Sequence, residues 1–334
     1  MPLFSFIIPV FNRPNEVEEL LQSLTQQTVD SSMFEVIVVE DGSQITCKEV
    51  CERFSKQLNL HYYYKENSGP GQSRNYGADK SCGEYYIVLD SDVVLPETYM
   101  QHVLDEIKRE PCDAFGGPDR AHHDFSPIQK AISYSMTSFF TTGGIRGGKK
   151  KLDKFYPRSY NMGIKSDVYK ALNGFSKMRF GEDIDFSIRI FDNGYRCRLF
   201  PEAWVYHKRR TDFRKFFKQV YNSGIARINL YKKYPSSLKL VHLLPAVFTV
   251  GVFLLCLSAL LLCSFVPLSL LLLYSILIFI DSATHYKSIK IGFLSVGAAF
   301  TQLMGYGLGF IEAWWKRCVR GLNEFQAFEK NFYK

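Results

Sequence analysis

Residues 84–95 read EYYIVLDSDVVL, an apolar run that is interrupted near its end by two carboxylates, Asp90 and Asp92. The apolar and aromatic residues before Asp90 predict a buried β-strand. A buried charge without a partner is costly, so these acids require a cation, a ligand or solvent beside them. The neighbouring segments of the chain decide among these partners.

Strands and helices alternate along the chain around this stretch. Apolar runs predict strands at 4–10, 34–39, 60–66 and 84–95. Amphipathic patterns predict helices at 12–27, at 46–58, within 69–81 and from 97 to about 108. This alternation with short loops is typical of parallel βαβ units, and therefore of an α/β fold with a mainly parallel sheet between flanking helices.

Acidic residues follow two of the predicted strands. Glu40 and Asp41 follow the second strand, and Asp90 and Asp92 end the fourth. In parallel α/β sheets, ligands bind at the carboxyl ends of the strands. Because the strand is ending, we expect the two aspartates of DSD to differ: one coordinates a divalent metal, and the other takes ribose hydroxyls or waters. A solvated pair of loop acids is the alternative.

The middle of the chain is less regular. Residues 113–160 are rich in glycine and aromatic residues and are predicted to be mostly loop, whereas residues 197–210 are strand-like. Residues 211–234 show an amphipathic helical pattern flanked by basic residues. Such a helix either lies in a membrane interface or packs on the soluble domain, and both alternatives stay open.

The C-terminal third of the chain is apolar. No Asp, Glu, Lys or Arg occurs at 240–280, which is long enough for two membrane spans at 243–262 and 265–283 with a turn near Pro267. A third uncharged run covers 291–311. Basic residues stay on the cytoplasmic side, and those after this run favour two spans with a re-entrant or interfacial third segment. Its length leads us to expect three crossings.

This shift in composition predicts the domain organisation. We expect a soluble domain at 1–235, which includes the helix at 212–234, a membrane region of two to three helices at 240–312, and a basic amphipathic tail at 313–334. Much of the net charge of +8 lies beside the apolar runs, as at the cytoplasmic face of an inner or plasma membrane with anionic lipids. No nucleic-acid motif occurs, so nucleic acid is not an expected partner.

Seven motifs are similar, in order and spacing, to those of one enzyme family. They read IIPVFNR at 7–13, VVEDGS at 38–43, GPGQSRNYGA at 69–78, LDSDVVL at 89–95, FGGP at 115–118, GFSKMRFGEDIDFSIRI at 174–190 and VYHKRR at 205–210. With these motifs, residues 1–235 resemble the catalytic domain of family 2 inverting glycosyltransferases of the GT-A fold, a Rossmann-like α/β fold. The apolar segments resemble those of membrane-attached members that build exopolysaccharide or lipid-linked glycans.

The resemblance implies which residues bind the donor and the metal. Those expected to bind the nucleotide-sugar are Pro9, Phe11, Asn12, Glu40, Asp41, Arg74, Asp90 and Ser91. Whether Glu40 or Asp41 contacts the base stays open, because the family usually has two aspartates there. Asp92 and His207 are expected to ligate a divalent metal, Mn²⁺ or Mg²⁺. A satisfied core histidine is the alternative for His207.

The GED motif at 181–183 is expected to carry the catalysis. An inverting transfer requires a general base that takes the proton of the acceptor hydroxyl. The resemblance assigns this role to Asp183, with Glu182 and Asp185 as supporting acids. A solvated helix start is the alternative for these acids. The residues expected to bind substrate on the acceptor side are Gly117, Asn161, Met162 and Glu182.

These features predict metal-dependent, inverting transfer of a single sugar from a nucleotide-sugar, expected to be a UDP-sugar, to a membrane-associated, lipid-linked glycan at the cytoplasmic face. A processive polysaccharide synthase is the first alternative, but residues 218–227, KQVYNSGIAR, lack the Gln-x-x-Arg-Trp signature of such members. A nucleotidyltransferase would need a glycine-rich basic loop where the chain has NRPNE at 12–16. A non-catalytic membrane scaffold would not require the intact DSD, GED and His207.

Overall fold

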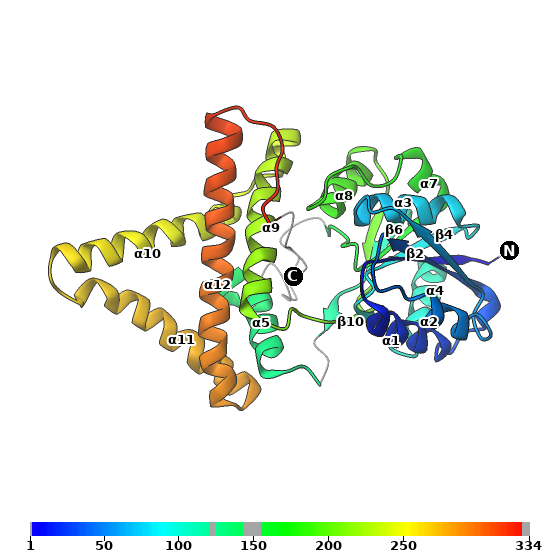
Figure 1. The fold of residues 1–334 in the computed structure, drawn as a ribbon, viewed down its shortest axis with the longest axis horizontal. Coiled ribbons are helices and arrows are strands. Elements are labelled where there is room, and N and C mark those ends of the chain that lie inside the picture. Colours follow the sequence, from blue (N-terminus) through cyan, green and yellow to red (C-terminus); the bar gives the residue numbers. More distant parts are fainter. Residues whose placement is uncertain (1, 121–123, 143–154, 329–334) are drawn as a thin grey trace. The chain divides into compact units, whose positions relative to one another are not determined.

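The computed structural model describes residues 2–120, 124–142 and 155–328. The chain forms two compact units (Figure 1). The first comprises Met1–His122 and Asp153–Lys208, and the second comprises His123–Leu152 and Arg209–Lys334. The helix predicted at 212–234 thus lies in the second unit.

The first unit is built on a mixed sheet of seven strands. In spatial order these are β3 (Leu60–Lys65), β2 (Phe34–Asp41), β1 (Phe4–Val10), β4 (Tyr85–Leu89), β8 (Asn161–Lys165), β6 (Ala114–Gly116) and β9 (Cys197–Leu199). All neighbours pair in parallel except that β8 is antiparallel to both β4 and β6. The predicted α/β fold with a mainly parallel sheet is confirmed.

Helices cover both faces of this sheet. On one face lie α1 (Pro14–Thr25), α2 (Lys48–Phe54) and α4 (Tyr99–Arg109), and on the other lie α3 (Pro70–Lys80), α7 (Ser166–Ala171) and α8 (Glu182–Asp192). The strand β1 shows why the sequence needs both layers, because Phe6 and Ile8 enter one core and Ile7 enters the other. A strand with apolar residues on both faces folds only between two layers.

A small second sheet places a distant segment beside DSD. It consists of β5 (Val93–Val94), β10 (Val205–His207) and β7 (Asp119–Arg120). The strand β10 pairs antiparallel with β5, with His207 opposite Val93, and parallel with β7. This register brings His207 next to the end of the DSD motif.

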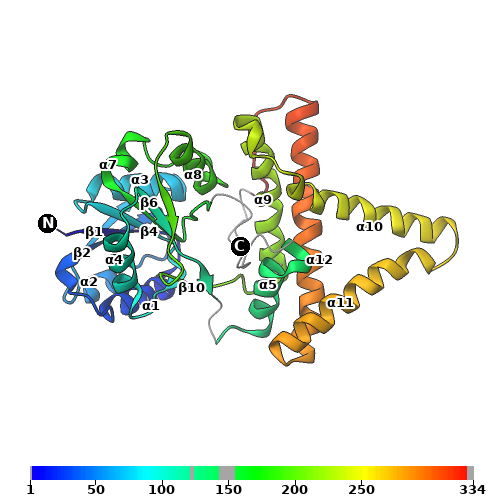
Figure 2. The same cartoon turned by 180° about the vertical axis from the view of Figure 1, so that it is seen from behind.

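The second unit is helical (Figure 2). Its helices are α5 (Pro127–Thr137), α6 (Phe139–Thr142), α9 (Phe213–Lys233), α10 (Leu244–Leu261), α11 (Ser269–Tyr286) and α12 (Ile289–Ala313), which continues as a π-helical turn (Trp314–Val319). The helix α5 lies in a region that was predicted to be mostly loop. The missed signal was its capping box, in which Ser126 and Gln129 cap each other around Pro127.

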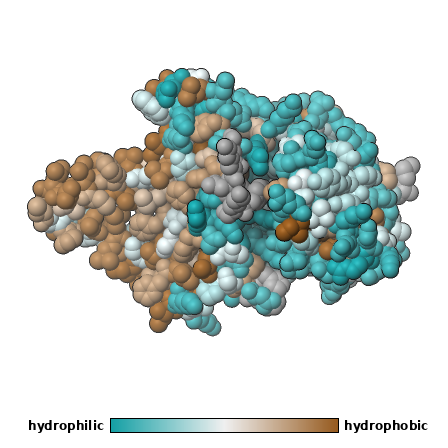
Figure 3. All heavy atoms as spheres, viewed as in Figure 1, coloured by the Kyte–Doolittle hydropathy of each residue, from teal (hydrophilic) through white to brown (hydrophobic). Residues whose placement is uncertain are grey.

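Glycines allow α9 to pack closely against α12. A Cβ atom on Gly224 would clash with the backbone of Tyr306, and one on Gly309 would clash with the carbonyl of Tyr221. The helix α9 therefore packs with the C-terminal helices of the second unit. Within the described residues, three stretches are long and apolar enough to cross a membrane: Leu240–Leu261, Val266–Tyr286 and Ile289–Val319. Apolar surface gathers over α10 and α11 (Figure 3).

Candidate active site

The two aspartates of DSD and His207 form one cluster in the first unit. One ligand atom of each of Asp90, Asp92 and His207 lies within 4.8 Å of the others. His207 Nε2 is 3.3 Å from Asp92 Oδ1, and the other carboxylate oxygen of Asp92 accepts a hydrogen bond from Arg13. The backbone holds this arrangement, because the Lys208 N–H donates to the Asp92 carbonyl at 3.0 Å.

The surroundings of His207 test whether this cluster suits a metal. Its ring lies against that of Tyr160, with centroids 4.9 Å apart, and Tyr160 donates to Asp119 at 3.0 Å. Its Nδ1 is buried without a hydrogen-bond partner among the described residues, unlike a satisfied core histidine. Two carboxylates with an imidazole that has an unpartnered nitrogen suit Mn²⁺ or Mg²⁺. The donor set therefore fits the predicted metal site.

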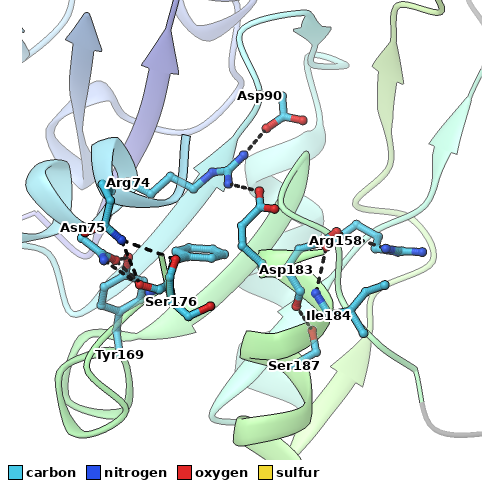
Figure 4. A network of polar contacts seen from close by, with 12 residues as sticks. Arg74, Asn75, Asp90, Arg158, Tyr169, Ser176, Asp183, Ile184 and Ser187 are labelled. Atoms are coloured by element: carbon cyan, nitrogen blue, oxygen red, sulfur yellow. Dashed lines mark hydrogen bonds and ion pairs between the residues drawn. The ribbon is translucent and has the colours of Figure 1, made fainter. Parts of the chain in front are cut away.

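Arg74 connects this cluster to the GED segment (Figure 4). It lies on α3, is buried, and donates at 2.8 Å both to Asp90 Oδ1 and to Glu182 Oε1. Burial acts to lower the pKa of Arg74, but the carboxylates of Asp90 and Glu182 outweigh it and raise that pKa above its usual value. Arg74 therefore stays charged. It was predicted to approach the ribose or the phosphates, yet both terminal nitrogens bind protein carboxylates in the structure.

The acids at the start of α8 have three different partners. Glu182 is buried and pairs with Arg74; Asp183 accepts from Arg158 at 3.2 Å; and Asp185, which is fully buried, pairs with Arg189 at 3.0 Å. Burial raises the pKa of Glu182 to about 7; Arg74 acts against this rise, and Asp183 adds to it. The alternative of a solvated helix start therefore does not describe these residues. Asp183 is partly exposed, as a group that meets substrate must be.

A second residue of α3 fixes the loop before α8 (Figure 4). Asn75 Oδ1 accepts from the Tyr169 hydroxyl at 2.7 Å and from the Phe175 N–H at 2.8 Å, and Asn75 Nδ2 donates to the Phe175 carbonyl at 2.8 Å. Gly174 adopts a φ of +58°, which favours glycine. Arg74 thus holds Glu182 of the GED motif, and its neighbour Asn75 holds the loop that precedes this motif.

Glu40 and Asp41 point to opposite faces of the sheet. The strand β2 extends to Asp41, beyond the predicted end at 39, so consecutive side chains alternate. Glu40 is fully buried and accepts from Ser43, from the Cys47 N–H at 2.8 Å and from Tyr62 at 3.3 Å. This interior role leaves Asp41 as the better candidate of the two for contact with a base.

Asp41 lies at the carboxyl end of β2 and is tied to the loop before α3. It accepts from Lys65 Nζ at 2.6 Å, from the Ser68 N–H at 2.8 Å and from the Gly69 N–H at 2.9 Å. Nearby, Asn12 adopts a φ of +55°, and its side-chain oxygen accepts from the Gln44 and Ile45 N–H groups at 2.8 and 3.0 Å. These contacts join the loops after β1, β2 and β3 at one edge.

Several other predicted residues are buried. Pro9 lies inside β1, Ser91 is buried, and Phe11 is half-buried. Asn161 accepts from Tyr99 at 2.7 Å and donates to the Ala203 carbonyl at 2.8 Å, which satisfies its amide within the protein. These residues belong to the framework of the first unit that supports the site.

Two of the positions predicted on the acceptor side have packing roles. Met162 is part of the apolar core, and a Cβ atom on Gly117 would clash with the Ala203 carbonyl. Like Asn161, both lie in the interior, and contact of these three residues with the acceptor stays a prediction.

Sequence reasoning missed the basic partners of the acids. Arg13 contacts Asp92, which lies 79 residues away, and Arg158 contacts Asp183, 25 residues away. Lys65, which pairs with Asp41, was also missed. Arg13 ends the motif IIPVFNR at 7–13, but nothing in a single sequence pairs residues at such separations. Only the folded structure shows that these residues are partners.

Replacing Arg74 with Met is expected to lower the free energy of unfolding by about 3–5 kcal/mol, because two carboxylates lose their buried partner. R74K should lose less stability, because it keeps the positive charge. It should still lose some, because a lysine lacks the fork of nitrogens that binds both carboxylates. Denaturant unfolding in detergent measures this. The control R53M breaks an exposed pair with Glu18 and should cost less than about 1 kcal/mol. Equal stability of R74M and R53M would contradict a structural role for Arg74.

Comparison with known proteins places this geometry in a family. The model of glycosyl transferase family 2 matches residues 5–172. The glycosyltransferase AglE of Haloferax volcanii is 26% identical over 254 residues, which cover 75% of this chain and 81% of AglE. The chain spans less than half the length of the other curated relatives compared.

Solved structures share the fold. TarS of Staphylococcus aureus, in a complex with UDP-GlcNAc, is 21% identical with a TM-score of 0.50, and the alignment covers 69% of this chain and 67% of that one. The mannosyltransferase PcManGT of Pyrobaculum calidifontis, in complex with GDP-Man and Mn²⁺, is 16% identical with a TM-score of 0.67 over 95% of this chain and 88% of that one. Because the family model matches half of the chain, the protein belongs to glycosyl transferase family 2 and is a glycosyltransferase with a GT-A-like fold.

Proposed function

We propose that the protein transfers a single sugar from a nucleotide-sugar donor, expected to be a UDP-sugar, to a membrane-associated, lipid-linked glycan with inversion at the anomeric carbon. One observation carries the proposal: DSD, His207 and GED, which are far apart in sequence, meet at the carboxyl edge of the sheet. Ligands of α/β sheets bind at this edge.

The donor side of the proposed site follows from the ends of β1, β2 and β4. Phe11, Asn12 and Asp41 would contact the nucleoside, and Asp90 and Asp92 would face the diphosphate. Asp92 and His207, with Asp90 beside them, would hold a divalent metal. A bound cation would offset the charge of the departing nucleoside diphosphate. Structures with UDP-GlcNAc, for TarS, and with GDP-Man and Mn²⁺, for PcManGT, support a donor and metal of this class.

Asp183 is proposed as the general base. The acceptor oxygen attacks the anomeric carbon, the bond from that carbon to the diphosphate oxygen breaks, and the hydroxyl proton passes to a carboxylate oxygen of Asp183. Arg158 and the Ile184 N–H, at 3.2 and 2.8 Å, hold this carboxylate in one orientation. A single displacement of this kind inverts the anomeric configuration.

A membrane-associated acceptor is proposed from the second unit. Three helices long and apolar enough to cross a membrane would keep the enzyme where a lipid-linked glycan resides. The basic residues that flank these helices favour the cytoplasmic face, so the active site is proposed to face the cytoplasm.

The full-length protein in detergent, supplied with Mn²⁺, radiolabelled UDP-sugars and a membrane lipid extract, tests the proposal. We expect label from at least one donor in the organic phase, and a product whose anomeric configuration, determined by NMR, is opposite to that of the donor. Retention of configuration would refute the single displacement. Label that enters only water-soluble products with every donor would refute the lipid-linked acceptor.

A further inference from the structure

The three apolar helices of the second unit contact one another over only part of their lengths. The helix α10 meets α12 near its start, where Pro245 and Thr249 approach Gly307, and Thr249 is the buried residue of α10. The helix α11 meets α12 where the rings of Tyr274 and Phe300 are 6.1 Å apart and, nearer its end, where the hydroxyls of Ser282 and Ser295 are 2.6 Å apart. Beyond these contacts, α10 and α11 leave α12 as a hairpin (Figures 1 and 2). Helices that cross a bilayer together would be expected to lie side by side.

The tip of this hairpin is apolar. Large hydrophobic side chains around the turn are exposed, and Phe265 is the most exposed of them at 86%. The residues from Leu254 to Tyr274 include no charged group. A turn that emerged among headgroups or water would gain nothing from such a surface, whereas a turn inside hydrocarbon requires it.

The turn also satisfies many of its own backbone groups. The Ser264 N–H donates to the Ala259 carbonyl at 3.0 Å, and the Ser264 hydroxyl accepts from the Val266 N–H at 3.3 Å. The Ser269 hydroxyl donates to the Val266 carbonyl at 2.7 Å, and Pro267 has no N–H to satisfy. Internal hydrogen bonding of this kind is what a backbone needs where no water is present.

The hairpin is too short to cross from its base on α12. About 14 residues separate Thr249, on α12, from Cys263 in the turn, which gives about 21 Å of helix. The hydrocarbon core is about 30 Å thick. The tip therefore ends inside the bilayer if α12 lies at its surface.

The packing of α9 along α12 places α12 at the surface. Contacts run from Phe213 beside Gly297 to Tyr221, which donates to Glu312 at 2.6 Å. If α12 crossed the bilayer, α9 would have to cross with it. Lys218 and Arg227 lie in the middle of α9, and charged side chains are strongly disfavoured at the bilayer centre. Lysines and arginines also stand near both ends of α12, which argues for one side of the membrane.

We propose that the α10–α11 hairpin enters the membrane from one side and returns to it, and that α12 lies with α9 at the surface without crossing. The partner of the hairpin tip is the hydrocarbon of the bilayer. This inference rests on the membrane attachment in the proposed function. It differs from the expected three crossings and agrees with the charge rule, because the basic residues beyond α12 stay on the side of the preceding ones.

Native cysteines report this topology in the full-length chain. Cys82 lies in the first unit, Cys263 in the hairpin turn and Cys318 after α12. The exposed and half-buried cysteines are replaced by serine and restored one at a time. A membrane-impermeant maleimide is then applied to bacterial spheroplasts and to inverted vesicles. We expect Cys82 and Cys318 to react in the same preparation, and Cys263 to react in neither until detergent is added.

Labelling of Cys318 and Cys82 in opposite preparations would show that α12 crosses, and labelling of Cys263 in the preparation where Cys82 is silent would show that the hairpin crosses. Either result overturns the proposal. Because Cys318 is half-buried, L322C in the exposed segment after it serves as a second reporter. Sugar transfer by the same vesicles is assayed separately, so an active enzyme with another topology would refute this inference alone.

A nitroxide on Cys263 identifies what covers the tip. In liposomes, a tip in hydrocarbon should show high accessibility to oxygen and low accessibility to a water-soluble nickel chelate. Low accessibility to both would place protein, such as a second copy of the chain, around the tip and would refute lipid as the partner.

Discussion

Replacing Asp183 with Asn is expected to lower the rate of sugar transfer by about 10²- to 10⁴-fold, the usual contribution of a general base. The amide is nearly the same size and can still accept from the Ile184 N–H, as the carboxylate does at 2.8 Å. It cannot take the proton of the acceptor hydroxyl. Affinity for the donor should change little, because Asp183 faces Arg158 and lies outside the cluster of Asp90, Asp92 and His207.

Initial rates with saturating donor and acceptor measure this effect. The matched control is D192N, which makes the same change at the other end of α8, where Asp192 is exposed. We expect D192N to retain wild-type activity. If D183N kept a rate within about threefold of D192N, another group would have to remove the proton, and the role of Asp183 would be wrong.

The arrangement of the sheet was largely predictable from residue patterns. Apolar runs alternate with amphipathic helices over the first 110 residues, and this order alone predicts parallel strands with helices on both faces. The antiparallel direction of β8 and the helix α5 were not predicted, because they follow or lie within a glycine-rich, aromatic region whose local pattern is irregular. Their positions depend on contacts with distant segments.

The geometry of the strands decides where several predicted site residues point. The side chain of Glu40 turns toward α2 because β2 continues through it, and a strand that ended at 39 would have left this acid in a loop. Asn161 and Met162 belong to β8, where successive side chains alternate between two cores. The motif identified a functional segment, but only the strand decides which way each side chain points.

The ion pairs of the site could not have been predicted from the sequence. Arg74 bonds to Asp90 across 16 residues and to Glu182 across 108. The resemblance placed Arg74 near the donor, whereas the structure makes it the link between the donor edge and the segment that holds Asp183. Separations of this size are set by the order of the strands in the sheet.

Asp92 is the residue whose loss should most affect donor binding. It faces His207 with one oxygen and Arg13 with the other. In D92N the metal would lose an anionic ligand, while Arg13 would face a neutral amide. Changes beyond the direct ligands already cost 10–100-fold in metal affinity, so loss of a ligand should weaken metal-dependent nucleotide binding by at least about 100-fold. The control D105N alters an exposed aspartate on α4 and should bind normally.

Calorimetry of the full-length protein in detergent tests the central claim most directly, with UDP, GDP and other nucleoside diphosphates titrated in the presence of Mn²⁺ or Mg²⁺. We expect the wild type and D105N to bind at least one of them with a stoichiometry of one. Binding should disappear when a chelator removes the metal, and in D92N. Failure of the wild type to bind any nucleoside diphosphate with either metal would contradict the account, as would unchanged binding after chelation.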